Sequence, residues 1–240
     1  MTSYETAALE ELQRWQRKML ENPSLFDSLS KKVQNRLNNF IPEKVHKVIT
    51  VTIQKMIEAV LFGAKYTTTA VLKEGSLLYR EAHIREKVDF YKKTAATEGA
   101  LTGAGGILLG LADFPLLIGI KIKLLFDIAA LYGYDVKDYK ERLYILYVFQ
   151  LAFSSAKRRK EVYQLLADWP LYKETLPENV EDFDWRTFQQ EYRDYIDLAK
   201  MAQLIPVIGA AVGAVANYRL INKLAETARN AYRIRYFDKQ

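Results

Sequence analysis

The sequence predicts an all-α protein, a bundle of about eight or nine helices in which two glycine-rich apolar segments pack together. Apolar residues recur at helical spacing along most of the 240 residues. No stretch of four to eight residues alternates apolar and polar side chains between turn signals, as a half-buried strand would. Half of the residues are hydrophobic and 27% are charged, a balance typical of a globular chain with one sizeable core. We therefore expect residues 1–240 to form a single domain.

The N-terminal helices are expected to occupy residues 1–98. Thr2 and Glu5 have the spacing of a capping box, in which a hydroxyl and a carboxylate each accept a hydrogen bond from a backbone N–H. An apolar stripe continues that helix until Asn22-Pro23 ends it. The same periodicity predicts further helices around residues 25–37, 45–60 and 79–91.

Two glycine-rich apolar segments follow, at residues 99–132 and 201–218. The glycines of the first segment are spaced four, three and four positions apart, and those of the second are four apart, so each set lies on one face of a helix. A face without side chains lets another helix approach closely. The glycines concerned are Gly99, Gly103, Gly106, Gly110, Gly209 and Gly213.

A break is expected inside the first segment. Asp113 can cap a helix, and Pro115 suits the first turn behind such a cap because its missing N–H would have no helical partner there. We therefore expect two helices, at about residues 99–111 and 114–132, joined by a tight turn at Asp113.

The apolar segments admit three environments. The first is a buried helix pair in a soluble bundle. The second is reversible insertion or docking at a membrane interface, and the third is a permanent span, for which the first segment has enough apolar residues. Four charges disfavour a permanent span, since charges at bilayer depth are expensive: Asp113, Lys121, Lys123 and Asp127. Lys123 and Asp127, four positions apart, are expected to pair within a helix.

The remaining elements follow from caps and breaks. Asp135 is expected to cap a helix through residues 143–153, and a further helix ends near Trp169-Pro170. Residues 173–184 are irregular and acidic, which indicates an exposed loop. Asp184 is expected to cap the next helix, and the last helix is expected to run from about Val207 to Arg235.

The formal net charge of +6 is spread along the chain, unlike the clustered stripe with which proteins neutralise adjacent phosphates, so no nucleic-acid partner is expected. The densest basic run favours either a solvated helix face or contact with phosphate or anionic lipid. It consists of Lys157, Arg158, Arg159 and Lys160. The last helix carries a second basic face, formed by Arg229, Arg233 and Arg235, which either complements the helix dipole or lies on a membrane surface.

Signals of catalytic chemistry are absent from the sequence. It has no cysteine, and its two histidines, His46 and His83, are far apart, so neither a zinc site nor a cysteine nucleophile is expected. It also lacks the phosphate-binding loop of nucleotide triphosphatases and the G-x-S-x-G motif of hydrolases. We assign no catalytic residue, metal or cofactor. Because the first 20 residues are charged and lack an apolar core, we expect no signal peptide and a cytoplasmic location.

The chain resembles the EcsC family of bacilli and their relatives. Three blocks carry the resemblance, and together they extend over nearly the whole chain: ELQRWQRKML with IPEKVHKVIT near the start, GALTGAGGILLGLADFPLLIGIKIKLLFDIAALYGYD, and IPVIGAAVGAVANYRLINKLAETARNAYR. Only the glycines and Asp113-Phe114-Pro115 transfer as motif residues, and the resemblance supplies no catalytic residue.

The resemblance implies a partner, since the founding member is encoded beside the ATPase and membrane subunits of an ABC transporter. We therefore expect a non-enzymatic accessory or regulatory protein at the cytoplasmic face of the membrane, peripheral to it, with transporter subunits and anionic lipid as partners. One alternative is a binder, carrier or enzyme for a lipid or other apolar ligand, with its pocket between the glycine-rich segments. Another is a purely structural helical module.

Overall fold

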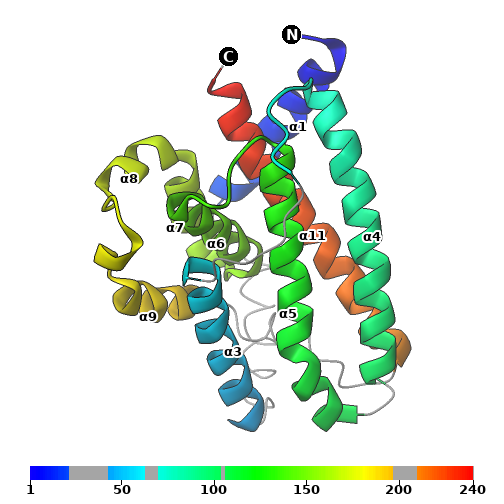
Figure 1. Cartoon of the computed structure of the whole chain (residues 1–240). Coiled ribbons are helices and arrows are strands. Elements are labelled where there is room, and N and C mark those ends of the chain that lie inside the picture. Colours follow the sequence, from blue (N-terminus) through cyan, green and yellow to red (C-terminus); the bar gives the residue numbers. More distant parts are fainter. Residues whose placement is uncertain (22–42, 63–69, 104–105, 197–209, 240) are drawn as a thin grey trace.

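The computed structural model describes residues 1–21, 43–62, 70–103, 106–196 and 210–239 (Figure 1). Within these ranges the chain forms helices and one isolated bridge between Ser154 and Ile196, which confirms the predicted all-α class. The helices are α1 (Ser3–Leu20), α3 (Glu43–Phe62), α4 (Leu77–Gly103), α5 (Gly106–Leu131), α6 (Tyr139–Phe153), α7 (Ala156–Ala167), α8 (Trp169–Thr175), the 3-10 turn η1 (Val180–Asp182), α9 (Trp185–Tyr195) and α11 (Ala210–Phe237).

Three long helices form one side of the molecule. Helix α4 lies along α5, and α11 packs along α4 and crosses behind α5 (Figure 1). Helix α1 packs against α11 and α7, so the first and last helices lie together at one end. The shorter helices α7, α8 and α9 extend to the other side of α6 (Figure 1).

Helix α6 is the centre of the core. Of its 15 residues, all except Arg142 are buried, so it is enclosed on every face. Leu143, Leu146 and Phe149 are each 0% exposed. Helix α5 contributes a second set of buried apolar side chains over residues 114–131. These two helices bring the long and short halves of the bundle together, because α6 contacts α5, α11 and α7.

Local capping signals gave two correct helix starts and one wrong one. The capping box at Thr2 and Glu5 is present, and the Asp184 carboxylate accepts a hydrogen bond from the Thr187 backbone N–H at 3.1 Å, as predicted. The cap of α6 is not Asp135 but Asp138, which accepts from the Lys140 N–H at 2.9 Å. Asp135 instead accepts from the Lys137 N–H in the preceding turn.

The predicted break at Asp113 is wrong. Helix α5 runs without interruption through Asp113 and Pro115. The glycines of the first segment also divide differently: Gly99 and Gly103 end α4, whereas Gly106 and Gly110 begin α5. They therefore do not form one face of a single helix. Buried Phe114, Leu117 and Ile118 flank the proline, and their packing favours a continuous helix over the local break signal.

The acidic stretch 173–184 is only partly a loop. Its first three residues complete α8, and residues 180–182 form η1. Leu176 packs into the core at 7% exposure, so this stretch is anchored at that point. Glu178 pairs with Lys140 at 3.2 Å, which ties it to the start of α6 as well.

Candidate functional site

The predicted glycine positions are resolved only as backbone. Gly99, Gly103, Gly106, Gly110 and Gly213 lie within helices whose side-chain surroundings at these points fall outside the described residues, as does Gly209 altogether. Asp113 is likewise placed only as part of α5, and Pro115 is exposed. Close packing at the glycines therefore stays a prediction.

The two glycine-rich segments do meet at one described contact. Lys121 on α5 is 0% exposed, and its ammonium donates to the Asn217 side-chain oxygen on α11 at 3.0 Å. It also donates to the Leu117 carbonyl of its own helix at 3.3 Å. Burial lowers the pKa of Lys121 to about 7, because desolvation disfavours the ammonium form. One turn on, Lys123 and Asp127 form the predicted intrahelical pair at 2.6 Å.

The basic run lies in the first turns of α7. Arg158 pairs with Glu161 at 2.9 Å, and Lys160 is exposed. Arg159 donates to the Glu21 carbonyl at the end of α1 at 3.4 Å. Lys157 is described only as backbone. Cations at a helix N-terminus oppose the helix dipole, so helix stability does not explain this placement.

The prediction of a basic surface at the end of α11 is wrong for two of its three members. The side chains of Arg233 and Arg235 are only 2% and 11% exposed, and each is held by carboxylates from distant parts of the chain. Arg229 is partly exposed and pairs with Glu11 at 2.7 Å. These arginines hold helices together and do not form a free cationic face.

The Arg233 pair joins three helices. Its Nε and Nη2 donate to the two oxygens of Glu81 on α4 at 2.6 and 2.7 Å, which is the two-pronged geometry of strong arginine–carboxylate pairs. Its Nη1 donates to Glu11 on α1 at 2.8 Å. The hydroxyls of Tyr4 and Tyr132 also donate to Glu81, at 2.6 and 2.8 Å. Glu81 thus accepts four hydrogen bonds, which come from α1, from α11 and from the turn after α5.

A second pair lies beside the first. Nη1 of Arg235 donates to both oxygens of Glu141 on α6, at 2.9 and 2.8 Å. The Tyr232 hydroxyl donates to the same carboxylate at 2.6 Å. The Arg235 guanidinium lies 3.6 Å from the ring centre of Tyr134 and 4.4 Å from that of Tyr144, within the range of cation–π attraction.

Charge pairing fixes the protonation of this cluster. Burial raises the pKa of Glu81, but the hydrogen bonds and charge of Arg233 outweigh it and hold the pKa below its usual value. Burial lowers the pKa of Arg233, but Glu81 more than compensates, so its pKa is raised. Burial, together with the Glu81 charge, raises the pKa of Tyr132, which stays a neutral donor. None of these groups is poised to exchange a proton near neutral pH.

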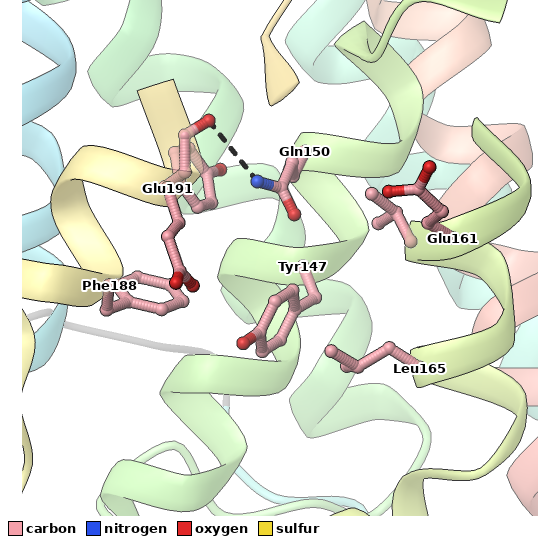
Figure 2. Close-up of a pocket in the computed structure, with 8 residues that line it drawn as sticks. Tyr147, Gln150, Glu161, Leu165, Phe188 and Glu191 are labelled. Atoms are coloured by element: carbon pink, nitrogen blue, oxygen red, sulfur yellow. Dashed lines mark hydrogen bonds between the residues drawn. The ribbon is translucent and has the colours of Figure 1, made fainter. Parts of the chain in front are cut away.

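Figure 2 shows a small pocket between α6, α7 and α9, with a volume of about 110 Å³. Tyr147 and Gln150 of α6 face Phe188 and Glu191 on one side, while Glu161 and Leu165 of α7 lie on the other. The Gln150 amide donates to the Tyr192 carbonyl at 3.3 Å. Aromatic walls and two carboxylates suit a small cationic group. The pocket is not lined by either glycine-rich segment, so it is not the apolar-ligand site predicted between them.

Two further observations concern the described ranges. Within them no group of three or more metal-ligating side chains could hold an ion. No helix in that part of the chain is both long and apolar enough to cross a bilayer.

Comparison with known proteins gives one family and two relatives. The model of the EcsC protein family matches residues 6–237. The chain is 45% identical over 231 residues to Protein EcsC of Bacillus subtilis (strain 168), which covers 95% of this chain and 94% of that protein. It is 28% identical over 247 residues to the uncharacterized protein YdbA of the same strain, covering 95% and 90% of the two chains. No solved structure matches the chain.

Proposed function

Because the chain belongs to the EcsC protein family, we propose that it is a non-enzymatic accessory or regulatory protein, acting at the cytoplasmic face of the membrane on an ABC transporter. The resemblance of the apolar blocks to the family, whose founding member is encoded beside transporter subunits, supports that partner. The family match extends from residue 6 to residue 237, so the whole fold takes part in the comparison.

The observation that carries the membrane-face proposal is the basic run at the start of α7. Arg158, Arg159 and Lys160 stand where the helix dipole disfavours cations. Only Arg158 has a carboxylate partner among the described residues, and that partner, Glu161, is itself 45% exposed. Each basic residue near an anionic membrane contributes about 1 kcal/mol to binding. The run therefore suits contact with anionic lipid or with an acidic surface of a transporter subunit.

The buried charges support a role without catalysis. Glu81 and Glu141 each accept a doubly hydrogen-bonded arginine and at least one tyrosine hydroxyl. A carboxylate bound in this way has both of its oxygens occupied by donors. We infer that this cluster fixes α4, α6 and α11 relative to each other and so presents a rigid surface to a partner.

Membrane fractionation with and without the transporter tests the proposal. The full chain is co-expressed with the ATPase and membrane subunits of the ABC transporter that the family resemblance implies as its partner. We expect recovery in the membrane fraction to rise when the transporter is present, and to fall in the double variant Arg158→Gln/Lys160→Gln. Recovery that is the same with and without the transporter would overturn the partnership.

A matched control uses α1. Arg14 and Lys18 are exposed, and Arg14 lies 4.0 Å from Glu10 much as Arg158 pairs with Glu161. The double variant Arg14→Gln/Lys18→Gln removes the same charge from another face of the protein. We expect this control variant to fractionate as the unmodified chain does. We also expect the control variant to change the transporter's rate of ATP hydrolysis in vesicles, and the α7 variant to change that rate less.

A further inference from the structure

A cationic pocket lies at the end of the bundle where both termini are found. Three stretches form it: the start of α4 with the segment that precedes it, the turn after α5, and the end of α11 with Lys239 beyond it; Figure 1 shows where these stretches lie. Its volume is about 250 Å³. The side chains around it are three cations and three tyrosines, with Gly133 between them, and no carboxylate is among them: Lys73, Arg80, Lys239, Tyr132, Tyr134 and Tyr236.

Arg80 is the fixed charge of this pocket. It is only 7% exposed, yet all four of its hydrogen bonds go to backbone carbonyls and none goes to a carboxylate within the described residues. The acceptors are the carbonyls of Gly75, Leu72, Leu131 and Lys73, at 2.7 to 3.2 Å. A guanidinium has five N–H donors, so one remains for another acceptor. Carbonyls satisfy its hydrogen bonds without cancelling its charge.

Gly133 makes this position of Arg80 possible. The backbone N–H groups of Gly133 and Tyr134 donate to the carbonyls of Ala130 and Ala129, both at 3.0 Å, which is a Schellman termination of α5. Gly133 has a φ of 92°, which L side chains rarely adopt. A Cβ there would lie 3.1 Å from the Leu72 carbonyl oxygen and 3.3 Å from Nη1 of Arg80. The glycine therefore leaves room for the guanidinium at the end of the helix.

The remaining two cations of the pocket are exposed lysines. Lys73 and Lys239 are exposed, and neither forms an ion pair within the described residues. The Lys239 ammonium lies 4.6 Å from the ring centre of Tyr134. Two tyrosines are already committed, since Tyr132 donates to Glu81 and Tyr236 donates to Glu5 at 2.9 Å. The Tyr134 hydroxyl makes no hydrogen bond in the part of the chain that the structure describes, so it is available as a donor.

We propose that this pocket binds a phosphate-type anion. One buried guanidinium, two exposed ammonium groups and the Tyr134 hydroxyl surround the space, and a phosphate group offers several acceptor oxygens and up to two negative charges to match them. Glu81, which accepts from the pocket residue Tyr132, does not compete with an anion for these cations, because its charge is neutralised by Arg233. The group could belong to free phosphate, a soluble phosphomonoester or a phospholipid headgroup, since the recognising chemistry is the same.

Binding of defined probes to the full-length chain tests the proposal. Isothermal titration with inorganic phosphate, at constant ionic strength set by chloride, measures the free anion. Flotation with phosphatidylcholine vesicles, with and without phosphatidic acid, measures the headgroup. We expect saturable binding of at least one probe, and at least about a tenfold loss of affinity in the double variant Lys73→Gln/Lys239→Gln, since a charge-assisted hydrogen bond is worth a factor of this size.

The control removes two exposed lysines elsewhere, Lys18→Gln/Lys137→Gln, and is expected to bind like the unmodified chain. Both lysine pairs are exposed, so all variants are expected to keep the same thermal midpoint in buffer without phosphate. Saturable phosphate binding identifies a free anion as the ligand, and binding only to phosphatidic acid vesicles identifies a headgroup. No binding of either probe, or equal binding by the two double variants, would overturn the proposal. The outcome is independent of the α7 variants that test the proposed function.

Discussion

Two buried cations in this protein have very different surroundings. Arg233, in the last turns of α11, meets two carboxylates and is doubly hydrogen-bonded to one of them. Lys121, in the middle of α5, donates among the described residues to the Asn217 amide oxygen and to one backbone carbonyl, and to no carboxylate. Both are at most 2% exposed. The pKa of Arg233 is raised by its partners, while that of Lys121 falls to about 7 through burial. Burial alone therefore does not determine whether an interior group is charged, because the charge of its partner matters as well.

Breaking the Arg233–Glu81 pair is expected to have the largest effect on the free energy of unfolding. Arg233→Met leaves Glu81 buried without its cation, and loss of one partner of a buried pair costs about 3–5 kcal/mol of unfolding free energy. Urea denaturation measures this change. The double variant Arg233→Met/Glu81→Gln removes both charges and should recover part of the loss. Equal destabilisation by the single and double variants would contradict a role for the uncompensated charge.

The Lys121 region predicts a pH effect instead. Its folded-state pKa is about 7, whereas an unfolded lysine titrates near 10.4. Between these values the unfolded chain binds more protons, so the free energy of unfolding should rise with pH, by at most about 1.4 kcal/mol per pH unit. The lysine's penalty is present in full below pH 7 and disappears as the pH rises through this window. Urea denaturation from pH 7 to pH 10 measures the slope.

Two variants identify the source of that slope. Lys121→Met removes the titrating group and should flatten the rise, while Lys137→Met, at an exposed lysine, should leave it unchanged. If the Lys121→Met curve runs parallel to that of the unmodified protein, the ammonium is not the source.

Arg80 is intermediate between Arg233 and Lys121, because it is a buried cation whose N–H groups are hydrogen-bonded to backbone carbonyls. Gly133→Ala places a methyl group against both Arg80 and the Leu72 carbonyl in a strained conformation, and should cost about 1–3 kcal/mol of stability. Gly119→Ala is the control. Apart from the nearby backbone of α5 and the adjoining residues, no atom lies within 4 Å of the added Cβ, and alanine stabilises a helix interior by about 0.5–1 kcal/mol relative to glycine. Thermal unfolding should therefore shift in opposite directions for the two variants, and a shared direction would refute this account of Gly133.

The exposed pair Arg158–Glu161 should show the smallest effect on stability. Exposed pairs of this spacing contribute about 0.2–0.5 kcal/mol, so Arg158→Gln should scarcely change the denaturation midpoint. Its effect should appear instead as weaker flotation with anionic vesicles at low salt, since salt screens the attraction. A large loss of stability would show that Arg158 acts as an interior cation, like Arg233.

The sequence predicted local features better than distant ones. The capping box at Thr2, the Asp184 cap and the Lys123–Asp127 pair were predicted correctly because the atoms of each lie within about one helical turn. Helix periodicity also gave the all-α class correctly. The break at Asp113 was wrong because packing of the apolar residues around Pro115 outweighs a local cap signal.

The buried charges could not be found from spacing. Arg233 and Glu81 are 152 positions apart, and nothing near either residue indicates the partner. From their spacing alone, the arginines of α11 were therefore predicted to form an exposed basic face. The cationic pocket was also missed, since Lys73, Arg80 and Lys239 come together only when α11 returns to the start of α4. One signal was available in Gly133, which follows an apolar helix in the position of a helix stop.

Helix α11 follows the other described helices in the sequence, and it is also the main neighbour of α4. During translation Glu81 on α4 has no arginine partner until Arg233 has emerged from the ribosome. The same holds for Glu141 and its partner Arg235. Both buried carboxylates therefore gain their arginine partners only after α11 has been made. A polypeptide that ended before Arg233 would hold Glu81 and Glu141 without the cations that compensate them in the folded protein, and an uncompensated buried charge is strongly destabilising.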